Sequence, residues 1–324
     1  MPHNLKDSPV LLVGTGAMAY EYAKVLRALG QSFVTAGHSE ARAATFRETW
    51  QVPTGSGPLA SQLQALNFTP KAAIVASSAA SLAEASRLLA QAGVMHLLIE
   101  KPAALCPDGA LQLAKDLQAS GASAYVAYNR RFYTSIQKAR QIIEEDGGAL
   151  SLKFDFSEAR YRIEKAGKSK VDLEGWFYGN STHVLDTAFY LAGRPKECLA
   201  RSSGSLSWHP SGAVFTGCGT TEQGVPFSYH SNWIAPGRWG VEVMTCQRRL
   251  VLQPMEQLFV QDHTSFALRE ESLEDEIDKL YKPGLYAQVK AFLSDKENPA
   301  FLSMTEHAEL FSLYAFIRDG GSIC

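Results

Sequence analysis

The chain has 324 residues, 46% of them hydrophobic and 20% charged, a balance typical of a globular protein of about two domains. The formal net charge of -2 gives no general attraction to nucleic acid or to an anionic membrane, and no apolar run approaches the roughly 20 residues that span a bilayer. The five cysteines form no CxxC pair and the polar N-terminus has no signal-peptide core, so we expect a cytoplasmic, reduced protein without a metal site.

The first predicted strand, Val10–Val13, runs directly into a glycine motif of the form G-x-G-x-x-A, and a helix follows. Gly14 allows a tight turn, Gly16 lets a pyrophosphate approach the backbone, and Ala19 allows close packing of helix on strand. Free N–H groups at the start of the helix favour phosphates. The sequence therefore predicts a dinucleotide site at Gly14, Thr15, Gly16, Ala17 and Met18, although a glycine turn with only a packing role would look the same.

The second predicted strand, Phe33–Ala36, ends without the acid that usually binds the ribose 2′-hydroxyl of NAD about 20 residues after the glycines. The missing carboxylate removes repulsion against a 2′-phosphate, and Ser39 and Arg42 could hydrogen-bond one with help from His38. The alternative is that these residues are merely solvated at the start of a helix. The sequence favours NADP over NAD and assigns Gly37, His38, Ser39 and Arg42 to the cofactor site.

Strands and helices then alternate, which predicts an α/β domain with a doubly wound parallel sheet. One strand ends at Ser77 and Ser78, and a capping box at Ser81 opens the next helix. A further strand, from Val94 to Ile99, ends in Glu100-Lys101-Pro102. Ligands bind outside such strand ends, so Lys101 suits a site that handles a proton, unless it is an ordinary surface lysine. We assign Ser77, Ser78, Glu100 and Lys101 to the cofactor site as well.

The order of these motifs, followed by Tyr128-Asn129-Arg130-Arg131-Phe132, resembles the glucose–fructose oxidoreductase / inositol dehydrogenase / MocA-like (Gfo/Idh/MocA) oxidoreductases. Glu-Lys-Pro at this distance from the glycines is the most specific element of the resemblance, which covers most of the chain. The resemblance implies a Rossmann domain over residues 1–125 and an α+β domain over residues 126–324 that binds substrate and forms oligomers. It also implies that the nicotinamide lies between the Rossmann domain and a large, open, mostly antiparallel sheet.

The pattern changes after residue 150, where five segments alternate in hydrophobicity as half-buried strands do. They are residues 152–156, 196–203, 213–221, 226–233 and 239–245. Such a sheet has one face on a core and the other facing a partner or substrate, and we expect a homo-oligomer through it.

A second chemical stretch surrounds His183. Asn180 or Ser181 can cap a helix that begins near His183, and the helix dipole would then disfavour the protonated imidazole. Members of the resembled family often carry an aspartate four residues before this histidine and another acid three after it. Asp186 matches the second acid, but Gly179 stands in place of the first. The resemblance therefore leaves Lys101 and His183 as the catalytic pair, with Tyr128, Arg130, Trp176 and Asn180 expected at the substrate.

These features predict an NAD(P)-dependent oxidoreductase that acts on a CH–OH group of a sugar, a cyclitol or a sugar nucleotide. Two alternatives remain open. One is a dihydrodiol dehydrogenase or bilin reductase on the same fold. The other is a non-enzymatic, dinucleotide-binding regulator of the galactose-repressor type, which the presence of both Lys101 and His183 disfavours.

Overall fold

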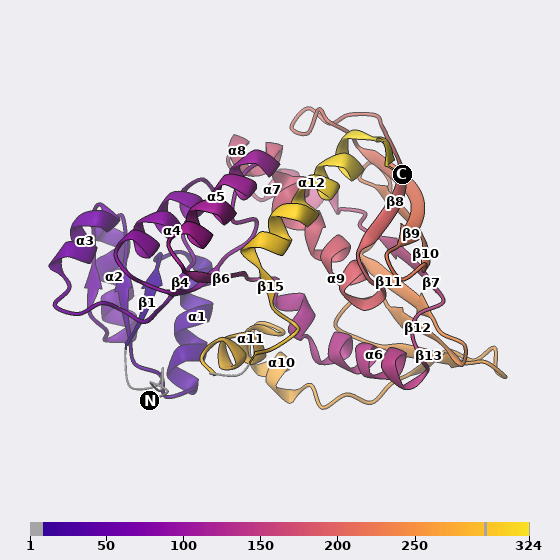
Figure 1. Ribbon diagram of the computed structural model, residues 1–324, viewed down its shortest axis with the longest axis horizontal. Helices are drawn as coiled ribbons and strands as arrows, with labels where there is room; N and C mark the ends of the chain where they lie inside the picture. Colours follow the sequence, from indigo (N-terminus) through magenta and orange to yellow (C-terminus); the bar gives the residue numbers. More distant parts are fainter. Residues whose placement is uncertain (1–8, 295–296, 324) are drawn as a thin grey trace. The chain divides into compact units, whose positions relative to one another are not determined.

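The computed structural model describes residues 9–294 and 297–323 (Figure 1). Contacts between Cα atoms divide the chain into two compact units. The first comprises the described residues within Met1–Asn129 and Ile277–Phe311, and the second those within Arg130–Glu276 and Ser312–Cys324. The first break follows Asn129, and a segment late in the sequence joins the first unit. No helix of the described ranges is long and apolar enough to cross a membrane.

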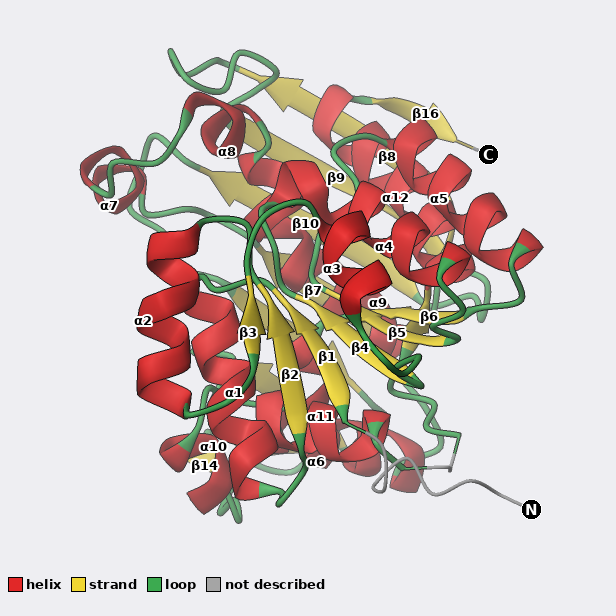
Figure 2. Ribbon diagram, turned by 90° about the vertical axis from the view of Figure 1, so that its left-hand side faces the viewer, coloured by secondary structure: helices red, strands yellow, loops and turns green. Residues whose placement is uncertain are grey.

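Sheet A, in the first unit, is parallel except for one antiparallel edge strand, and Figure 2 shows its strands side by side. The chain runs outward from the first strand, returns to its other side, and runs outward again, which is the doubly wound arrangement that alternating strands and helices predict. In spatial order the strands are β15 (Leu302–Ser303), β6 (Ser123–Val126), β5 (His96–Ile99), β4 (Ala72–Val75), β1 (Val10–Val13), β2 (Phe33–Ala36) and β3 (Thr54–Gly55).

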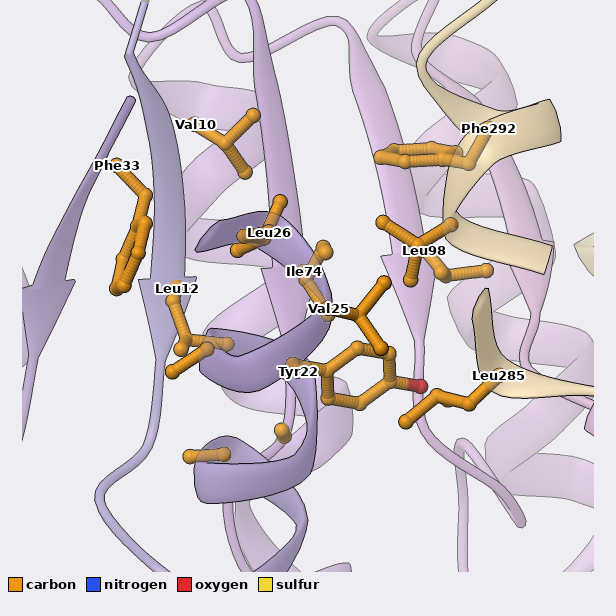
Figure 3. Packing of buried hydrophobic residues seen from close by; sticks show 14 of the residues in the cluster. Val10, Leu12, Tyr22, Val25, Leu26, Phe33, Ile74, Leu98, Leu285 and Phe292 are labelled. Carbon is orange, nitrogen blue, oxygen red and sulfur yellow. The ribbon is translucent and has the colours of Figure 1, made fainter. Parts of the chain in front are cut away.

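Sheet A is buried on both faces, as its apolar strands require. Leu12, Ile74 and Leu98 lie on one face in a core with residues of α1 and α11, including Tyr22 and Leu285 (Figure 3). Helices α4 and α5 contact β4, β5 and β6. The helices of this unit are α1 (Ala17–Ala28), α2 (Glu40–Trp50), α3 (Leu59–Ala65), α4 (Leu82–Gln91), α5 (Pro107–Ala119) and α11 (Leu285–Phe292). Two more, α10 (Glu276–Leu280) and α12 (Met304–Asp319), contain residues of both units.

Sheet B, in the second unit, has nine strands and is antiparallel except for the pair β7–β10. This confirms the predicted open, mostly antiparallel sheet. In spatial order the strands are β14 (Arg269–Glu270), β13 (Phe259–Asp262), β12 (Arg248–Leu252), β11 (Gly240–Met244), β7 (Ser151–Asp155), β10 (Pro226–Asn232), β9 (Val214–Thr221), β8 (Pro195–Ser203) and β16 (Gly321–Ile323).

The two faces of sheet B differ in character. One face packs its aromatic side chains, such as Phe154 and Phe227, against α9 (Thr182–Ala192), and α6 (Thr134–Glu145) also contacts the sheet. The other face carries charged side chains in register, where Lys153 and Glu242 form an ion pair of 2.9 Å and Arg249 bonds the same carboxylate at 2.6 Å. The alternation of the sequence predicted this division.

Two predicted helix caps are wrong. The hydroxyl of Ser81 does not cap α4, because it donates instead to the Ser78 carbonyl oxygen and to Ser77 Oγ. Neither Asn180 nor Ser181 caps α9, because a π-helical turn, Phe177–Ser181, leads straight into it. His183 therefore does not lie at a free helix start, and the dipole argument for its neutral form does not apply there.

Candidate functional site

The glycine turn after β1 is shaped for close contact with a ligand. Gly14 has φ +123°, and a Cβ at this position would lie 2.4 Å from the carbonyl oxygen of Ala76, so the turn needs glycine there. A Cβ at Gly16 would meet no atom within 4 Å, which leaves the space beside its backbone open. Helix α1 begins at Ala17 without a side-chain cap, so no capping side chain occupies the N–H groups of its first turn. A pyrophosphate fits this arrangement.

The predicted cofactor residues lie at one edge of sheet A. Parallel strands end on the same side, and the segments in question directly follow the carboxyl ends of β1, β2, β4 and β5. Ser77 and Ser78 follow β4, where the hydroxyl groups of Ser78 and Ser81 are 2.8 Å apart. The structure therefore brings together the first-unit residues assigned to the cofactor, at the edge where α/β sheets bind ligands.

The end of β2 is closely packed at its glycine and open beyond it. A Cβ at Gly37 would lie 2.9 Å from the side chain of Thr15, so Gly37 and Thr15 are closely packed. His38, Ser39 and Arg42 are exposed. Glu40, the first acid after β2, is engaged by Ser56, which donates to its carboxylate. The exposed hydroxyl and guanidinium groups are available to an anion.

The turn after β5 is fixed by hydrogen bonds on both sides of Lys101. The Glu100 N–H donates to the Val75 carbonyl at 2.9 Å, and the Tyr22 hydroxyl donates to the Glu100 carboxylate at 2.7 Å. The Nε2 atom of His307 lies 3.0 Å from the carbonyl oxygen of Pro102. Burial raises the pKa of Glu100, while Lys101 and Tyr22 act in the opposite direction. Glu100 therefore anchors the turn through Tyr22, and Lys101 is held half-buried at the strand end.

The predicted substrate residues fall in both units. Tyr128 belongs to the first unit and is fully buried, with its ring 5.7 Å from that of His307. Arg130, Trp176, Asn180 and His183 belong to the second. There the Arg130 guanidinium lies 4.8 Å from the ring of Trp239, whose centroid is 6.3 Å from that of the buried His183. Trp239 links two predicted residues and was not itself predicted.

Asp186, the acid that matches the family pattern, forms a buried ion pair. Its two carboxylate oxygens accept from Nε and Nη2 of Arg131 at 2.8 and 2.7 Å. The side chains are 0% and 8% exposed respectively. This bidentate contact joins α9 to the segment before α6 and occupies both carboxylate oxygens. Asp186 therefore supports the helix that carries His183.

Glu158 is, with Trp239, a residue of this site that sequence reasoning missed. It follows β7, is 6% exposed, and accepts hydrogen bonds from the side chains of Asn180 and Ser181. Burial raises the pKa of Glu158 to about 7, although Ser181, Asn180, Trp176 and Arg130 all act to lower it. A glutamate just after a strand carries no motif, so the only signal was an acid at the carboxyl end of a sheet strand.

These features define a class of protein: the parallel sheet, the glycine turn and the open helix start form a dinucleotide-binding Rossmann unit. Residues 9–128 match the family model GFO_IDH_MocA, described as an oxidoreductase family with an NAD-binding Rossmann fold. This match confirms the resemblance to the Gfo/Idh/MocA oxidoreductases and the oxidoreductase class that the motifs predict. No curated protein sequence matches the chain as a relative.

Solved structures share the whole fold at low identity. An oxidoreductase from Agrobacterium radiobacter, in complex with NAD+, L-tartaric acid and magnesium, has 14% identity and a TM-score of 0.81, and the match covers 98% of each chain. A UDP-N-acetylglucosamine 3-dehydrogenase from Acidithiobacillus ferrooxidans has 16% identity, a TM-score of 0.76 and 96% coverage of each. An inositol dehydrogenase homolog from Azotobacter vinelandii, complexed with NAD+, has 16% identity and a TM-score of 0.74, covering 98% of this chain and 97% of that one. These likenesses confirm the predicted fold class.

Proposed function

We propose that the protein is an NAD(P)-dependent dehydrogenase that acts on a CH–OH group of a sugar, a cyclitol or a sugar nucleotide. The observation that carries the proposal is that Lys101 lies at the same edge of sheet A as the glycine turn. That turn fits a dinucleotide, and a lysine held at the neighbouring strand end suits a reacting oxygen. The sugar and inositol dehydrogenases among the similar structures support the substrate class.

The cofactor would be held by backbone and small side chains. Gly14 to Met18 would bind the pyrophosphate, and the Ser77 and Ser78 hydroxyls would lie along the dinucleotide. When bound, a nicotinamide supplies hydride donation or acceptance at its ring. We propose NADP as the preferred form, because Ser39 and Arg42 are exposed beyond β2 and the nearest acid, Glu40, is engaged by Ser56.

Lys101 and His183 would handle the proton. The ammonium group of Lys101 can donate a hydrogen bond to the substrate oxygen and stabilise negative charge that develops on it. The imidazole of His183 can accept the hydroxyl proton during oxidation and return it during reduction. Asn180 would hydrogen-bond the reacting hydroxyl or carbonyl group before the proton moves. Arg130 and Trp176 would bind the rest of the substrate, through one aromatic face and a polar group that pairs with hydroxyls. Tyr128 would contribute from the first unit.

The test is a panel of compounds with each cofactor, read by the absorbance of reduced nicotinamide. Sugars, cyclitols, UDP-sugars and a trans-dihydrodiol are each offered with NAD and with NADP. Turnover of a carbohydrate supports the proposal, and turnover of the dihydrodiol alone assigns the chain to the other enzyme class on this fold. Tight cofactor binding by calorimetry without turnover of any compound would instead favour a regulator of the galactose-repressor type.

Two further proposals concern the whole protein. The charged open face of sheet B, with Lys153, Glu242 and Arg249, would form a homo-oligomer in which salt bridges fix the register between copies. Light scattering after size-exclusion chromatography, at low and at high salt, tests this, and a monomer at every concentration contradicts it. We also propose a cytoplasmic location, which cell fractionation tests.

A further inference from the structure

The backbone around Glu158 is fixed before any ligand binds. Phe156 is fully buried, and its ring lies 5.8 Å from those of Phe177 and Phe215. The Asn232 N–H donates to Ser157 Oγ at 2.8 Å, which ties the segment to the end of β10. A Cβ at Gly237 would lie 2.4 Å from the Cβ of Ser157, so a loop backbone also closes over it. The carboxylate of Glu158 is therefore presented from a rigid frame.

The two oxygens of that carboxylate are bonded unequally. Oε1 accepts from Ser181 Oγ at 2.8 Å and from Asn180 Nδ2 at 3.0 Å. Oε2 accepts from the same Asn180 nitrogen at 3.1 Å. An ionised carboxylate can only accept hydrogen bonds, so it requires the amino end of the Asn180 amide to face it. The carbonyl end of Asn180 then points the other way.

We propose that Glu158 sets the hydrogen-bonding polarity of Asn180, so that the charge of this carboxyl decides whether Asn180 offers the substrate an acceptor or a donor. A proton added to Glu158 goes to Oε2, the oxygen with fewer bonds. The new O–H then faces the amino group of Asn180, and no hydrogen bond can form between them because both groups are donors. Turning the amide over removes this conflict, because the Asn180 carbonyl then accepts from Glu158 and its amino group faces outward.

The reorientation of the Asn180 amide affects the alcohol and the ketone form of a substrate differently. This consequence rests on the proposed function. An alcohol has an O–H that needs an acceptor, which Asn180 offers while Glu158 is ionised. A ketone has only a carbonyl oxygen, which needs a donor, and Asn180 offers one when Glu158 is protonated. The pair therefore favours binding of the alcohol at higher pH and of the ketone at lower pH. Glu158 acts through Asn180 and is a positioning residue.

The surroundings of Glu158 set the pH at which its carboxyl is protonated and connect it to His183, the proposed proton carrier. The Arg130 charge and Trp176, the residue before the π-helical turn, both lower the pKa of this carboxyl. Burial outweighs both and brings its pKa to about 7. His183 lies one helical turn beyond Asn180 and faces Trp239, over which the Arg130 guanidinium lies. Gly179 stands where the resembled family often has an acid, and the carboxyl that contacts Asn180 is that of Glu158.

The switch itself is tested without a substrate. Full-length protein with 13C-labelled glutamate carboxyl carbons and 15N-labelled asparagine amides is titrated with pH and followed by NMR. The Glu158 signal is assigned as the one that disappears in Glu158→Gln, and the Asn180 signals as those that disappear in Asn180→Ala. We expect the Glu158 carbon to titrate near neutral pH and the Asn180 amide signals to shift with the same midpoint. Glu164→Gln, at an exposed acid that accepts from the Trp208 indole, is the matched control and should leave both signals in place. An ordinary acidic midpoint for Glu158, or Asn180 signals that ignore it, overturns the proposal.

The consequence for binding is tested by kinetics on myo-inositol and its ketone, and on D-glucose and its lactone. For the wild type we expect the KM of the alcohol to rise about tenfold from pH 8 to pH 6 while the KM of the carbonyl compound falls, and Glu158→Gln should flatten both profiles and keep kcat within a few-fold. If the enzyme turns over these compounds but Glu158→Gln leaves the dependence of KM on pH unchanged, the inference is wrong while the proposed function still stands. A coupled NMR transition without turnover of either pair upholds the switch and counts against the proposed substrates.

Discussion

The two units build their predicted ligand sites in different ways. In the first unit the site is mostly backbone: Gly14 and Gly16 shape a turn at the start of α1, and the chemistry lies in free N–H groups. In the second unit the site consists of side chains from separate segments, with Glu158 after β7, Asn180 in the π-helical turn and Trp239 before β11. A backbone site is encoded by a short contiguous motif, whereas a side-chain network exists only once distant segments meet. The comparison predicts that changes in the first unit alter cofactor binding and oxygen stabilisation, while changes in the second alter proton exchange and the substrate.

The largest effect is expected for His183→Asn, which keeps a polar group but removes one that titrates. We expect kcat to fall roughly 10²- to 10⁴-fold, the range for a lost general acid–base, and the limb of the pH–rate profile near neutrality to flatten. Steady-state rates at saturating cofactor across pH measure both. His263→Asn, at an exposed histidine of the same unit, is the control. A neutral limb that persists without His183 would move the proton to another group, with Lys101 the first candidate.

Asp186→Asn should produce the largest loss of stability. It removes one charge of the buried pair with Arg131 and leaves the other without compensation, which typically costs about 3–5 kcal/mol. Urea unfolding measures the change. Glu144→Gln, which removes the exposed pair of Glu144 with Arg140 on α6, should cost less than about 0.5 kcal/mol. Equal losses in the two variants would contradict a supporting role for the buried pair.

Lys101→Met keeps the aliphatic stem and removes the charge. We expect kcat/KM to fall roughly 10²-fold or more, in line with the loss of one donor to a developing oxyanion. The dissociation constant of the cofactor, from fluorescence titration, should change little. Lys115→Met, at an exposed lysine of α5 in the same unit, is the matched control. Near-normal turnover of the Lys101 variant would remove this residue from the mechanism.

Glu158 should make stability depend on pH. Its pKa is raised from 4.5 to about 7 in the folded state, so its stabilising contribution is complete below pH 4.5 and is lost as the pH rises through about 7. The loss is of order 3 kcal/mol, since each pKa unit is worth about 1.4 kcal/mol. Glu158→Gln lacks this contribution, so its stability relative to the wild type should increase between pH 5 and pH 8. A constant difference in unfolding free energy across that range would show that Glu158 titrates normally.

The smallest effect is expected for a variant that tests the preference for NADP over NAD. Arg42→Ala should weaken NADP binding about tenfold and leave NAD binding unchanged, because a charge-assisted hydrogen bond to the 2′-phosphate is a contact that NAD never makes. Fluorescence titration with both cofactors measures this, with Lys115→Ala as the control for a lost surface charge. Tighter binding of NAD than of NADP by the wild-type protein would overturn the preference itself.

The sequence by itself determined most of the longer helices and strands of both units and their division into a parallel and a mostly antiparallel sheet. Strand–turn–helix order and the spacing from the glycines to Glu100-Lys101-Pro102 are features of a contiguous stretch of chain, so they can be recognised without the tertiary structure. The short edge strands β3, β14, β15 and β16 were not predicted, because two or three residues carry no periodicity and pair only where a neighbour is present.

Only the tertiary structure decided how the acids are used. Asp186, which matches the family pattern, is committed to Arg131, and the carboxyl that holds Asn180 comes instead from Glu158, which lies 22 residues away in the sequence. The same folding brought Ser181 to Glu158, where its hydroxyl donates to the carboxylate and does not cap a helix. Such choices cannot be read from spacing, because the pKa and the partners of a carboxyl depend on which segments bury it.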